Sequence, residues 1–571
     1  MNSKIRLAIV EDNASARIHL RSHLLSLGNI EIFSYSNGQE LKTALRTQTV
    51  DVVMFDFHLG QHKNGVEWVQ SLQRTGLIKP STGIIFVTSD QTTQTIGQIV
   101  DLQPDFLILK PYTIRQIKQT VSQYISVREK TINVLRCLDT GRNGQALTDL
   151  NQMLSAPEFM RIHMHLLKLK GKVLLNAQQY DDAIALYESV LVQSERVIWA
   201  RWGLIKCWFM QGDWSACQRY ICELVDIQLT KNKAFEWLAC IAFEENNYER
   251  AEQWLDNIKI SELTLQATRL KTLTYQMQQR IEEAIVLLER KRQSALSVRE
   301  HRDELTFELA DCHIKYATIA SPLKRKENLH KARCLIGSAG RHAGDRQAHQ
   351  RRDYMLSLAN LLEGDINRAK RLLENEWMHD FSRSEANTMI IAAQVWHGIG
   401  DEQRAQLILQ QCNDKRADIN DQIEQIITQK QVIEGEKTIG CAVDSAMDQN
   451  RLGTESFVAQ QHEVALAYFY NAFKLAEHIP AFAINLLQSM VKAHLSNYKG
   501  INTLNLVGKL KQQKLSETNR IRLQDIESTI SGNYAIFAIP KNTEDLMLQR
   551  TENMLGTNEA STLTPPQHRM H

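Results

Sequence analysis

The chain has 571 residues, which is more than one hydrophobic core supports, so several domains or an extended array are expected. Its 67 basic and 65 acidic residues leave a formal net charge of +2, and this balance demands neither nucleic acid nor an anionic membrane as a partner. The 9 cysteines form no C-x-x-C pair, no signal peptide is visible and no apolar run nears the roughly 18 residues of a membrane span, which predicts a soluble protein of a reducing cytoplasm.

The first part of the chain alternates short apolar runs with helical patterns, which is typical of a doubly wound α/β domain with a parallel sheet of five strands. The run at residues 52–55 is apolar throughout, as a central strand covered on both faces should be. The last helix is predicted over about 113–127, and with no Gly/Ser/Pro linker after it a stiff junction is expected. The predicted strands are residues 5–10, 30–34, 51–55, 83–87 and 105–109.

Polar residues follow four of these runs at the point where each strand ends. They are Glu11 and Asp12, Asp56, Thr88, and Lys110. The carboxyl ends of parallel strands share one edge of a sheet, where ligands bind. Three carboxylates gathered there repel one another unless a cation joins them, and Mg²⁺ is the usual choice for a hard, all-oxygen site. Any one of these residues is compatible with an ordinary strand end, but all five on one edge favour a site.

This pattern, in order and spacing, resembles the receiver (CheY-like) domain of bacterial two-component response regulators over residues 1–127. The resemblance implies that Asp56 is the phosphoacceptor, taking a phosphoryl group from a phosphohistidine. It also implies that Asp12 and Asp56 hold Mg²⁺ directly, with Glu11 acting through water and the backbone carbonyl of His58 completing the ligands. Thr88 would bond a phosphoryl oxygen and Lys110 would pair with the phosphate. The chemistry fits, because phosphoryl transfer to a weak carboxylate nucleophile needs neutralised charge and positioning.

Two features depart from the family pattern. The position three before Lys110, usually an aromatic switch residue, is Leu107, and Phe106 one place earlier is expected to face the other side of the strand. His58 and Asp90 occupy the positions that tune the access of the hydrolytic water in such domains. They are expected to set the lifetime of the phosphate, although for His58 a solvent-facing loop residue is an equal alternative.

From residue 129 a helical repeat replaces the α/β pattern. An aromatic residue three positions before a small residue recurs with a spacing of 34 at Tyr180, Trp214 and Tyr248. The pattern and period resemble the tetratricopeptide repeat, a helix–turn–helix unit that stacks into a superhelical solenoid. The array is predicted over 128–535. It is clearest at 160–295 and 350–412, and 413–450 is helical without the pattern. The small residues of the copies are Ala183, Cys217, Ala251, Ala284, Ala369 and Ala405, with weaker copies at Ala332 and Ala465.

Two segments stand apart from the repeats. Residues 541–571 are polar and are predicted to be a disordered tail. Residues 323–352 are rich in Lys and Arg, which fits an acidic or phosphate-rich partner, but a solvated helix face is favoured because no helix-turn-helix or aromatic–basic ladder accompanies them. No P-loop, G-x-S-x-G or H-E-x-x-H motif is present, so no output enzyme is expected beyond the receiver's own phosphorylation and autodephosphorylation.

The leading hypothesis is a phosphorelay response regulator. A histidine kinase or phosphotransfer domain would phosphorylate Asp56, and the new charge would change how the repeat array binds a protein partner, such as another phosphorelay component. This layout resembles VieB-type receiver–tetratricopeptide regulators. The alternatives are a phosphate sink that only autodephosphorylates, and a transcription regulator with a DNA-binding surface near 323–352. Neither a membrane nor nucleic acid is the expected partner.

Overall fold

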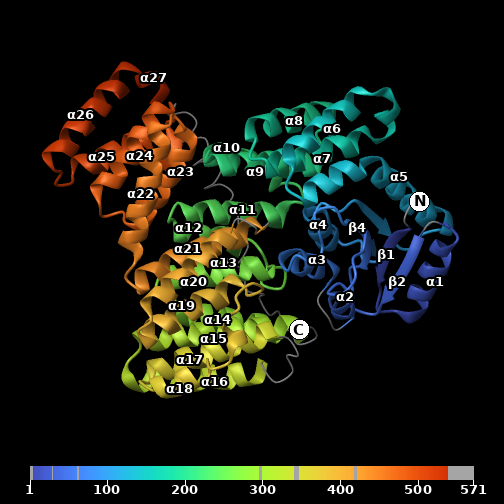
Figure 1. Ribbon diagram of the computed structural model, residues 1–571, viewed down its shortest axis with the longest axis horizontal. Coiled ribbons are helices and arrows are strands. Elements are labelled where there is room, and N and C mark those ends of the chain that lie inside the picture. Colours follow the sequence, from blue (N-terminus) through green and yellow to red (C-terminus); the bar gives the residue numbers. More distant parts are fainter. Residues whose placement is uncertain are drawn as a thin grey trace, which may run out of the picture.

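The structure is a computed structural model, and it describes residues 4–28, 30–60, 64–294, 299–339, 346–416, 419 and 421–537 (Figure 1). The predicted tail at 541–571 lies outside the described residues, as do residues 340–345 of the basic segment. No helix among the described residues combines the length and the apolar character that a membrane crossing requires.

The N-terminal part is a parallel sheet of five strands in the order β2-β1-β3-β4-β5, as the sequence predicts. Every residue of β3 and β4 is buried, because helices cover both faces of the sheet. The predicted strand bounds are confirmed to within one residue. The strands are β1 (Ile5–Val10), β2 (Ile30–Tyr35), β3 (Val52–Asp56), β4 (Gly83–Thr88) and β5 (Phe106–Leu109).

Each face of the sheet has its own hydrophobic core. Leu20 and Leu24 of one helix and Ile117 and Val121 of another fill the first core. The second core contains Trp68 and other apolar residues of the remaining three helices. The helices of the first face are α1 (Ala14–Leu25) and α5 (Ile114–Asp139), and those of the second are α2 (Gly38–Ala44), α3 (Gly65–Arg74) and α4 (Thr93–Asp101).

The junction with the rest of the chain is a continuous helix. The sequence predicts that the last helix of the α/β part ends near residue 127, but the structure shows that this end is wrong, because α5 runs unbroken for 26 residues. Residues 128–130 are Arg-Glu-Lys, which are good helix formers, and no proline, glycine or capping residue interrupts them. The stiff junction expected from the missing linker is therefore present as helix.

Contacts at the foot of the sheet fix the direction of α5. The buried Arg128 side chain pairs with Asp51 before β3 (Nη2–Oδ1 3.0 Å) and donates a hydrogen bond to the carbonyl of Ser81 before β4. Asp139 at the end of the helix accepts hydrogen bonds from the backbone N–H and the hydroxyl of Ser81 (3.0 and 2.6 Å). The helix is therefore anchored at the strand beginnings, at the opposite edge from the polar strand ends.

The remainder is almost entirely helical, apart from a short hairpin of β6 (Asn497–Tyr498) and β7 (Ile501–Asn502). Short 3-10 turns, η1 (Pro157–Ile162) and η3 (Glu376–His379), connect some of the helices. The helices of this array are α6 (Asn143–Ser155), α7 (His163–Asn176), α8 (Tyr180–Gln193), α9 (Ile198–Gln211), α10 (Trp214–Leu224), α11 (Lys231–Glu244), α12 (Tyr248–Asp256), α13 (Leu265–Met277), α14 (Ile281–Ser294), α15 (Arg299–Ile319), α16 (Pro322–Ala339), α17 (Arg346–Leu362), α18 (Ile366–Arg371), α19 (Ala386–Ile399), α20 (Glu402–Arg416), α21 (Gln422–Thr438), α22 (Ala442–Val458), α23 (His462–Leu475), α24 (Pro480–Lys492), α25 (Thr503–Lys511), α26 (Glu517–Gly532) and α27 (Tyr534–Phe537).

The predicted repeat is a structural repeat. Tyr180, Trp214 and Tyr248 each begin a helix, namely α8, α10 and α12. The small residue of every predicted copy, including the weaker ones at Ala332 and Ala465, is fully buried. The apolar residues four positions later are also buried, which confirms the helix–turn–helix solenoid. They are Tyr187, Ile221, Leu255, Leu288, Leu373, Leu409 and Phe469.

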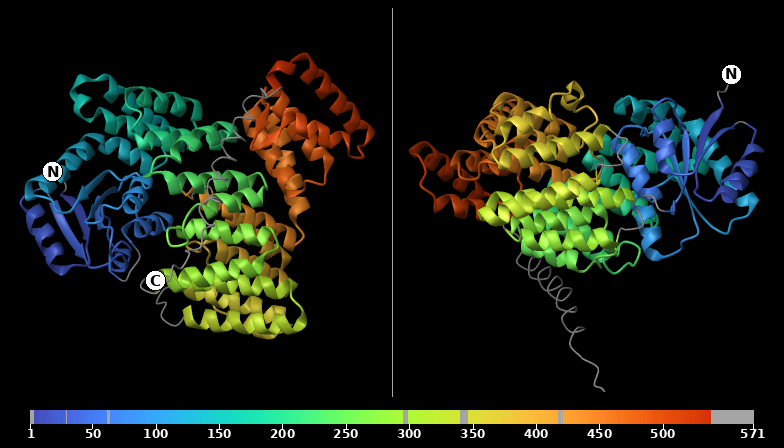
Figure 2. Two further views of the ribbon diagram at one scale, coloured as in Figure 1. Left: turned by 180° about the vertical axis from the view of Figure 1, so that it is seen from behind. Right: turned by 90° about the horizontal axis from the view of Figure 1, so that it is seen from below.

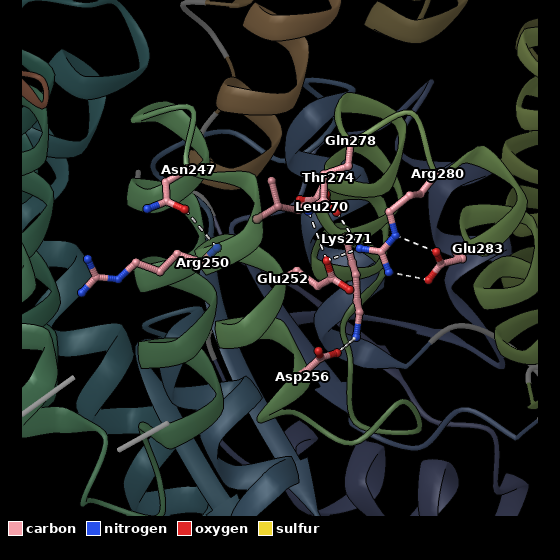
Figure 3. A network of polar contacts seen from close by, with 10 residues as sticks. All are labelled: Asn247, Arg250, Glu252, Asp256, Leu270, Lys271, Thr274, Gln278, Arg280 and Glu283. Atoms are coloured by element: carbon pink, nitrogen blue, oxygen red, sulfur yellow. Dashed lines mark hydrogen bonds and ion pairs between the residues drawn. The ribbon is translucent and has the colours of Figure 1, made fainter. Parts of the chain in front are cut away.

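Polar contacts also join successive units, as the network between α12, α13 and α14 illustrates (Figure 3). Arg280 donates to Glu252 (2.6 Å) and also pairs with Glu283. Lys271 pairs with Asp256 (2.5 Å). Because the pairs with Glu252 and Asp256 reach back to α12, they help to set the angle between units.

The array folds back on itself. Helix α21, in the segment that lacks the repeat pattern, packs against α11 and α13 as well as against its neighbour α19. Ile423, Ile426 and Ile427 of α21 belong to the same core cluster as α11 and α13. The later helices α19–α21 therefore form a second layer beside the earlier ones, which is seen from below in Figure 2.

The α/β part lies against α7, α9 and α11 of the array (Figure 1). The Lys168 ammonium on α7 donates to the carbonyls of Gln103 and Pro104 (3.1 and 3.0 Å), in the loop before β5. The rings of Phe106 and His165 lie 5.6 Å apart between their centroids. The edge of the sheet formed by β5 therefore contacts the array directly.

Helix α4 approaches the array most closely at Gly97. A Cβ atom at this position would lie 2.7 Å from the carbonyl oxygen of Leu229, in the loop before α11. Glycine in a helix interior costs about 1 kcal/mol relative to alanine, so this one has a packing reason. The absence of a side chain lets α4 touch the backbone of the array.

Asp101 at the end of α4 is enclosed by this contact. Its Oδ1 atom and the indole nitrogen of Trp202 on α9 are both buried in this contact. Burial raises the pKa of Asp101 to about 7, while the Lys233 ammonium opposes this rise and the Glu236 carboxylate adds to it. The contact thus contains a carboxyl group that folding favours in its neutral form.

Gly203→Ala is expected to destabilise the array. The ring of Tyr187 lies between Gly171 and Gly203, and a Cβ at Gly203 would lie 2.4 Å from a ring atom. Overpacking of this kind costs about 1–3 kcal/mol, which should lower the urea midpoint followed by tryptophan fluorescence. The control is Gly508→Ala at an exposed position of α25, where no atom lies within 4 Å of the new Cβ and a gain of up to about 1 kcal/mol is expected. A Gly203→Ala protein as stable as the parent would contradict this packing.

Asp101→Asn is expected to stabilise the protein more at pH 8 than at pH 5. Folding raises the pKa of Asp101 from 3.8 to about 7, so the parent loses stability as the pH rises between these values. The amide does not titrate, and the difference between the urea midpoints of variant and parent should therefore grow with pH. Asp226→Asn, at an exposed position before α11, is the control and should show no such growth. An equal difference at both pH values would refute the enclosed, neutral carboxyl.

Candidate functional site

The sheet register brings the predicted acidic residues together. β1 pairs with β3 so that Val10 lies opposite Phe55, and the next residues of the two strands are Glu11 and Asp56. Both carboxylates are buried, with 3 % and 7 % of each residue exposed. Two buried carboxylates side by side require a nearby positive charge.

Lys110 supplies that charge. Its Nζ atom lies 2.7 Å from Oδ2 of Asp56 and 2.8 Å from Oε2 of Glu11. β4 pairs with β5 so that Thr88 lies opposite Leu109, which places Lys110 directly after the strand at the same edge. The structure thus joins three of the predicted site residues in one ion-pair cluster.

The pKa shifts in this cluster reflect its burial and its charges. Burial raises the pKa of the Glu11 carboxyl; the hydrogen bond from Lys110 opposes that rise, and the charge of Asp56 adds to it. Burial works to lower the pKa of Lys110, but its hydrogen bonds to Asp56 and Glu11 outweigh burial and leave that pKa raised. Lys110 therefore stays positively charged at neutral pH and is available to an incoming anion.

Asp12 completes an acidic notch that opens to solvent. One oxygen of each of Glu11, Asp12 and Asp56 lies within 4.8 Å of the others. Asp12 is exposed, whereas the other two are buried. Arg17 on α1 donates to the carbonyl of Glu11 (2.6 Å) and holds the turn that carries both acidic residues.

The notch fits Mg²⁺ by the chemistry of its donors. Three carboxylates against one ammonium leave an excess of negative charge, and all donors are hard oxygen atoms, which Mg²⁺ prefers. The exposed position of Asp12 leaves room for the water molecules that this ion usually retains. The predicted ligand role of the His58 carbonyl stays a prediction.

The side chains of Thr88 and His58 both contact Asp90. The buried Thr88 hydroxyl accepts the backbone N–H of Asp90 (3.1 Å). The ring Nε2 of His58 lies 3.1 Å from Oδ2 of Asp90, so the two residues predicted to tune phosphate lifetime contact each other. The hydroxyl of Thr95 in the first turn of α4 donates to the same oxygen (2.7 Å). The hydrogen bond from Thr95 is the largest cause that holds the pKa of Asp90 well below its usual range.

Asp90 therefore connects the site to α4. His58 lies two residues after Asp56, and Thr88 is the last residue of β4. The partner Thr95 is in the helix that contacts the array. The sequence analysis missed Thr95. In the sequence, the only sign of Thr95 was its position in the first turn of α4, whose N-cap is Thr92.

Leu107 and Phe106 face opposite sides of β5, as predicted. Leu107 packs with the core under α3 and α4, and Phe106 packs with the core under α1 and α5. Phe106 makes an edge contact with Tyr124 and reaches His165 of the array. No aromatic side chain at position 107 is therefore available to follow Thr88.

Glycines that the sequence analysis did not single out shape the loop after Asp56. A Cβ at Gly65, the first residue of α3, would lie 2.4 Å from the Asp56 carbonyl oxygen. Gly60 has a φ of +66°, and a Cβ there would lie 3.0 Å from Oδ2 of Asp12. These positions require glycine because the backbone folds closely over the notch.

The basic segment is largely neutralised where it is described. Arg333 pairs with Glu363 through both nitrogens of its fork, and Arg351 pairs with Glu308 (2.9 Å). The acidic partners of these two arginines lie outside the segment, which is why the segment looks unbalanced by itself. This supports the expected solvated face. The remaining pairs are Lys324–Glu282, Lys331–Glu327 and Arg352–Asp353.

Comparison with known proteins places the notch in a family. Residues 7–122 match the family model described as "Response regulator receiver domain". The strand order, the acidic notch and this match agree, so the N-terminal part is a receiver domain.

Two curated relatives cover this part of the chain. The regulatory protein VirG of Agrobacterium tumefaciens is 26% identical over 181 residues, which span 32% of this chain and 61% of VirG. The probable chemotaxis protein CheY of Rhizobium etli is 25% identical over 118 residues, 21% of this chain and 90% of that protein. The chain thus spans less than two thirds of the length of VirG.

Two solved structures give weaker overlaps. The RcsB response regulator of Salmonella typhimurium overlaps 22% of this chain and 61% of its own, with 14% identity and a TM-score of 0.20. The Cut9–Hcn1 hetero-tetramer structure overlaps 78% of this chain and 99% of its own, with 13% identity and a TM-score of 0.23. The solenoid assignment rests on the buried repeat positions instead.

Proposed function

We propose that this protein is a phosphorelay response regulator in which Asp56 accepts a phosphoryl group and the helical array delivers the output by binding a protein. The observation that carries the proposal is the Lys110 ammonium held at 2.7 and 2.8 Å between Asp56 and Glu11. A phosphoryl group entering this notch meets a nucleophilic carboxylate and a fixed positive charge together.

The residues of the chain divide the work of transfer. The Asp56 carboxylate attacks phosphorus as the bond to the donor imidazole breaks, and the imidazole leaves as a neutral ring after taking a proton from water. Lys110 moves from the carboxylate to the phosphoryl oxygens, where it stabilises the charge of the transition state. The Thr88 hydroxyl, one strand away, exchanges its bond to the Asp90 N–H for one to a phosphoryl oxygen.

Asp12 and Asp56 would hold Mg²⁺ directly, with Glu11 through water and the His58 carbonyl, and the ion would supply further charge neutralisation. The donor set supports this assignment because its three carboxylates lie within one small notch.

The output runs through α4. When Thr88 turns to the phosphoryl group, the Asp90 network that anchors Thr95 is remodelled, and α4 shifts. Gly97 and Asp101 of that helix rest on the array, so a small shift of α4 changes the contact with α9 and α11. The array then binds or releases its partner.

The partners follow from this scheme. A sensor histidine kinase or a phosphotransfer domain donates the phosphoryl group, and a protein, such as another phosphorelay component, contacts the array. The proposed setting is the cytoplasm, with neither a membrane nor nucleic acid as the partner. The receiver–solenoid layout supports a VieB-type regulator, and the only chemistry proposed for the chain is its own phosphorylation and autodephosphorylation.

A phosphate sink is the alternative that one observation favours. Leu107 stands at the aromatic switch position, and Phe106 is held between Tyr124 and His165. A receiver without that switch can lose its phosphate without passing a signal to the array. The third candidate, a transcription regulator, loses support because the basic segment is largely ion-paired.

Asp56→Asn is expected to abolish phosphorylation by acetyl phosphate, because the amide cannot form an acyl phosphate. Intact-mass spectrometry should show one added phosphoryl group in the parent and none in the variant. Chelation of Mg²⁺ should remove labelling of the parent as well. Glu31→Gln, on the exposed part of edge strand β2, is the control and should label normally. Labelling that persists in Asp56→Asn would refute the assignment.

Gly97→Ala is expected to separate α4 from the array while the receiver still labels at the parent rate. The new methyl group collides with the Leu229 carbonyl, although alanine suits the helix better than glycine. Hydrogen exchange in α9 and α11 should then be fast before phosphorylation and should change little on adding beryllofluoride with Mg²⁺.

Gly144→Ala in α6 is the matched control, because no atom lies within 4 Å of its Cβ. Parent and control should show the beryllofluoride-induced change in exchange. If hydrogen exchange changes in neither the parent nor Gly97→Ala while Asp56-phosphate turns over quickly, the phosphate-sink alternative replaces the output proposed above.

A further inference from the structure

Four positively charged side chains from distant parts of the sequence surround the end of α11. Arg416 ends α20, Lys430 is in α21, Lys474 is near the end of α23, and Lys499 is in the turn between β6 and β7. All four act on one carboxylate, that of Glu244, the last residue of α11. Burial raises the pKa of this carboxyl and the four cations oppose the rise. We call these five residues the Glu244 cluster.

None of the four cations has a carboxylate within ion-pair distance among the residues that the structure describes. Lys474 donates to the backbone carbonyl of Glu244 (3.2 Å), and Lys430 donates to the hydroxyl of Tyr248 (3.1 Å). Arg416 donates to the amide oxygen of Gln429 (2.5 Å). Neutral acceptors thus hold three cations, which leaves most of their charge uncompensated.

Lys499 is held by aromatic faces instead. Its ammonium lies 4.8 Å from the ring centroid of Tyr470 and 5.5 Å from that of Tyr498. These contacts attract the cation but do not neutralise it.

Lys499 and Gly500 form the two-residue turn of the β6–β7 hairpin, where both residues have a positive φ. The φ of Lys499 is +47°, a left-handed conformation that a non-glycine residue adopts at a cost of about 1–3 kcal/mol. The turn is fixed to the array, because the Lys499 N–H donates to the carbonyl of Gly212 (2.8 Å) and a Cβ at Gly212 would lie 2.9 Å from the lysine side chain.

The charge balance of the surroundings is also positive. The other acidic groups near the cluster are Glu245 and Glu477. Burial raises the pKa of Glu245 to about 7, so this carboxyl is partly neutral. Burial lowers the pKa of Lys499 to about 8, Glu244 opposes that shift, and Arg416 and Lys474 add to it. The cations repel one another, and an anion among them would relieve that repulsion.

We propose that the Glu244 cluster is a binding site for a small phosphate-bearing anion. A guanidinium fork beside three ammonium groups matches the oxygens of a phosphoryl group, and a multiply charged anion offsets several cations together. The half-buried setting between α11, α21, α23 and the hairpin suits a small ligand better than a protein surface. Bound there, the anion joins the last part of the array to α11, whatever the state of Asp56.

The test is isothermal titration of the full-length protein with sodium pyrophosphate in EDTA, at constant ionic strength, so that no magnesium complex enters the receiver notch. Saturable binding of about one pyrophosphate per chain is expected. Lys499→Gln and Lys474→Gln should each weaken binding by at least about tenfold, because each removes one cation from the site. Lys326→Gln, at an exposed position of α16, should bind as the parent does.

Titrations with orthophosphate and ATP under the same conditions identify the source of the phosphate. Tighter binding of ATP than of pyrophosphate assigns a nucleotide, and equal binding assigns the phosphate chain alone. The proposal is overturned if the parent gives no saturable binding with any of the three, if Lys326→Gln weakens binding as much as Lys499→Gln, or if a hexaglutamate peptide binds more tightly. If a cluster variant fails to fold, the titration of the parent protein still tests the proposal.

Discussion

The ion pairs of Lys110 with Asp56 and Glu11 are the constraint on which the receiver site depends. Both carboxylates are buried at the end of the sheet, and removing one partner of a buried ion pair typically costs about 3–5 kcal/mol. The strands deliver these groups to one edge because they are parallel and in register. The same ammonium that makes the unphosphorylated site stable is the group that an incoming phosphoryl oxygen competes for, so folding and chemistry use one contact.

The second constraint is the contact between α4 and the array. Glycine at position 97 lowers the helix propensity of α4 but lets the helix touch Leu229. Asp101 is enclosed in the same contact, and burial raises the pKa of its carboxyl. Thr95 in the first turn of the same helix bonds Asp90 beside the phosphoacceptor. α4 therefore has one end at the chemistry and the other at the array, whereas α5 is anchored at the far edge of the sheet by Arg128 and Asp139.

The sequence could predict what depends on local pattern. Strand bounds, the polar strand ends and the buried small residues of the repeats all follow from periodicities of two and 3.6 residues and from the rule that parallel strands end at one edge. It could not predict which residue Asp90 would bond or that α21 would pack on α11. Those contacts depend on long-range packing, which leaves no spacing in the sequence. The end of α5 was misplaced for a related reason, since a domain boundary does not oblige a helix to stop.

The fold-back of the array limits how a signal can travel. A solenoid whose units touch only their neighbours can stretch or twist along its length. Here α21 shares a core cluster with α11 and α13, so the middle of the array is closed by contacts between distant units. Opening it would expose Ile423, Ile426 and Ile427, which are buried, and burying such a side chain contributes about 1.5–3 kcal/mol. A shift of α4 does not supply the free energy needed to expose several such side chains. The receiver is therefore expected to act on the array at their shared contact with α7, α9 and α11, and the closed middle to move as one body.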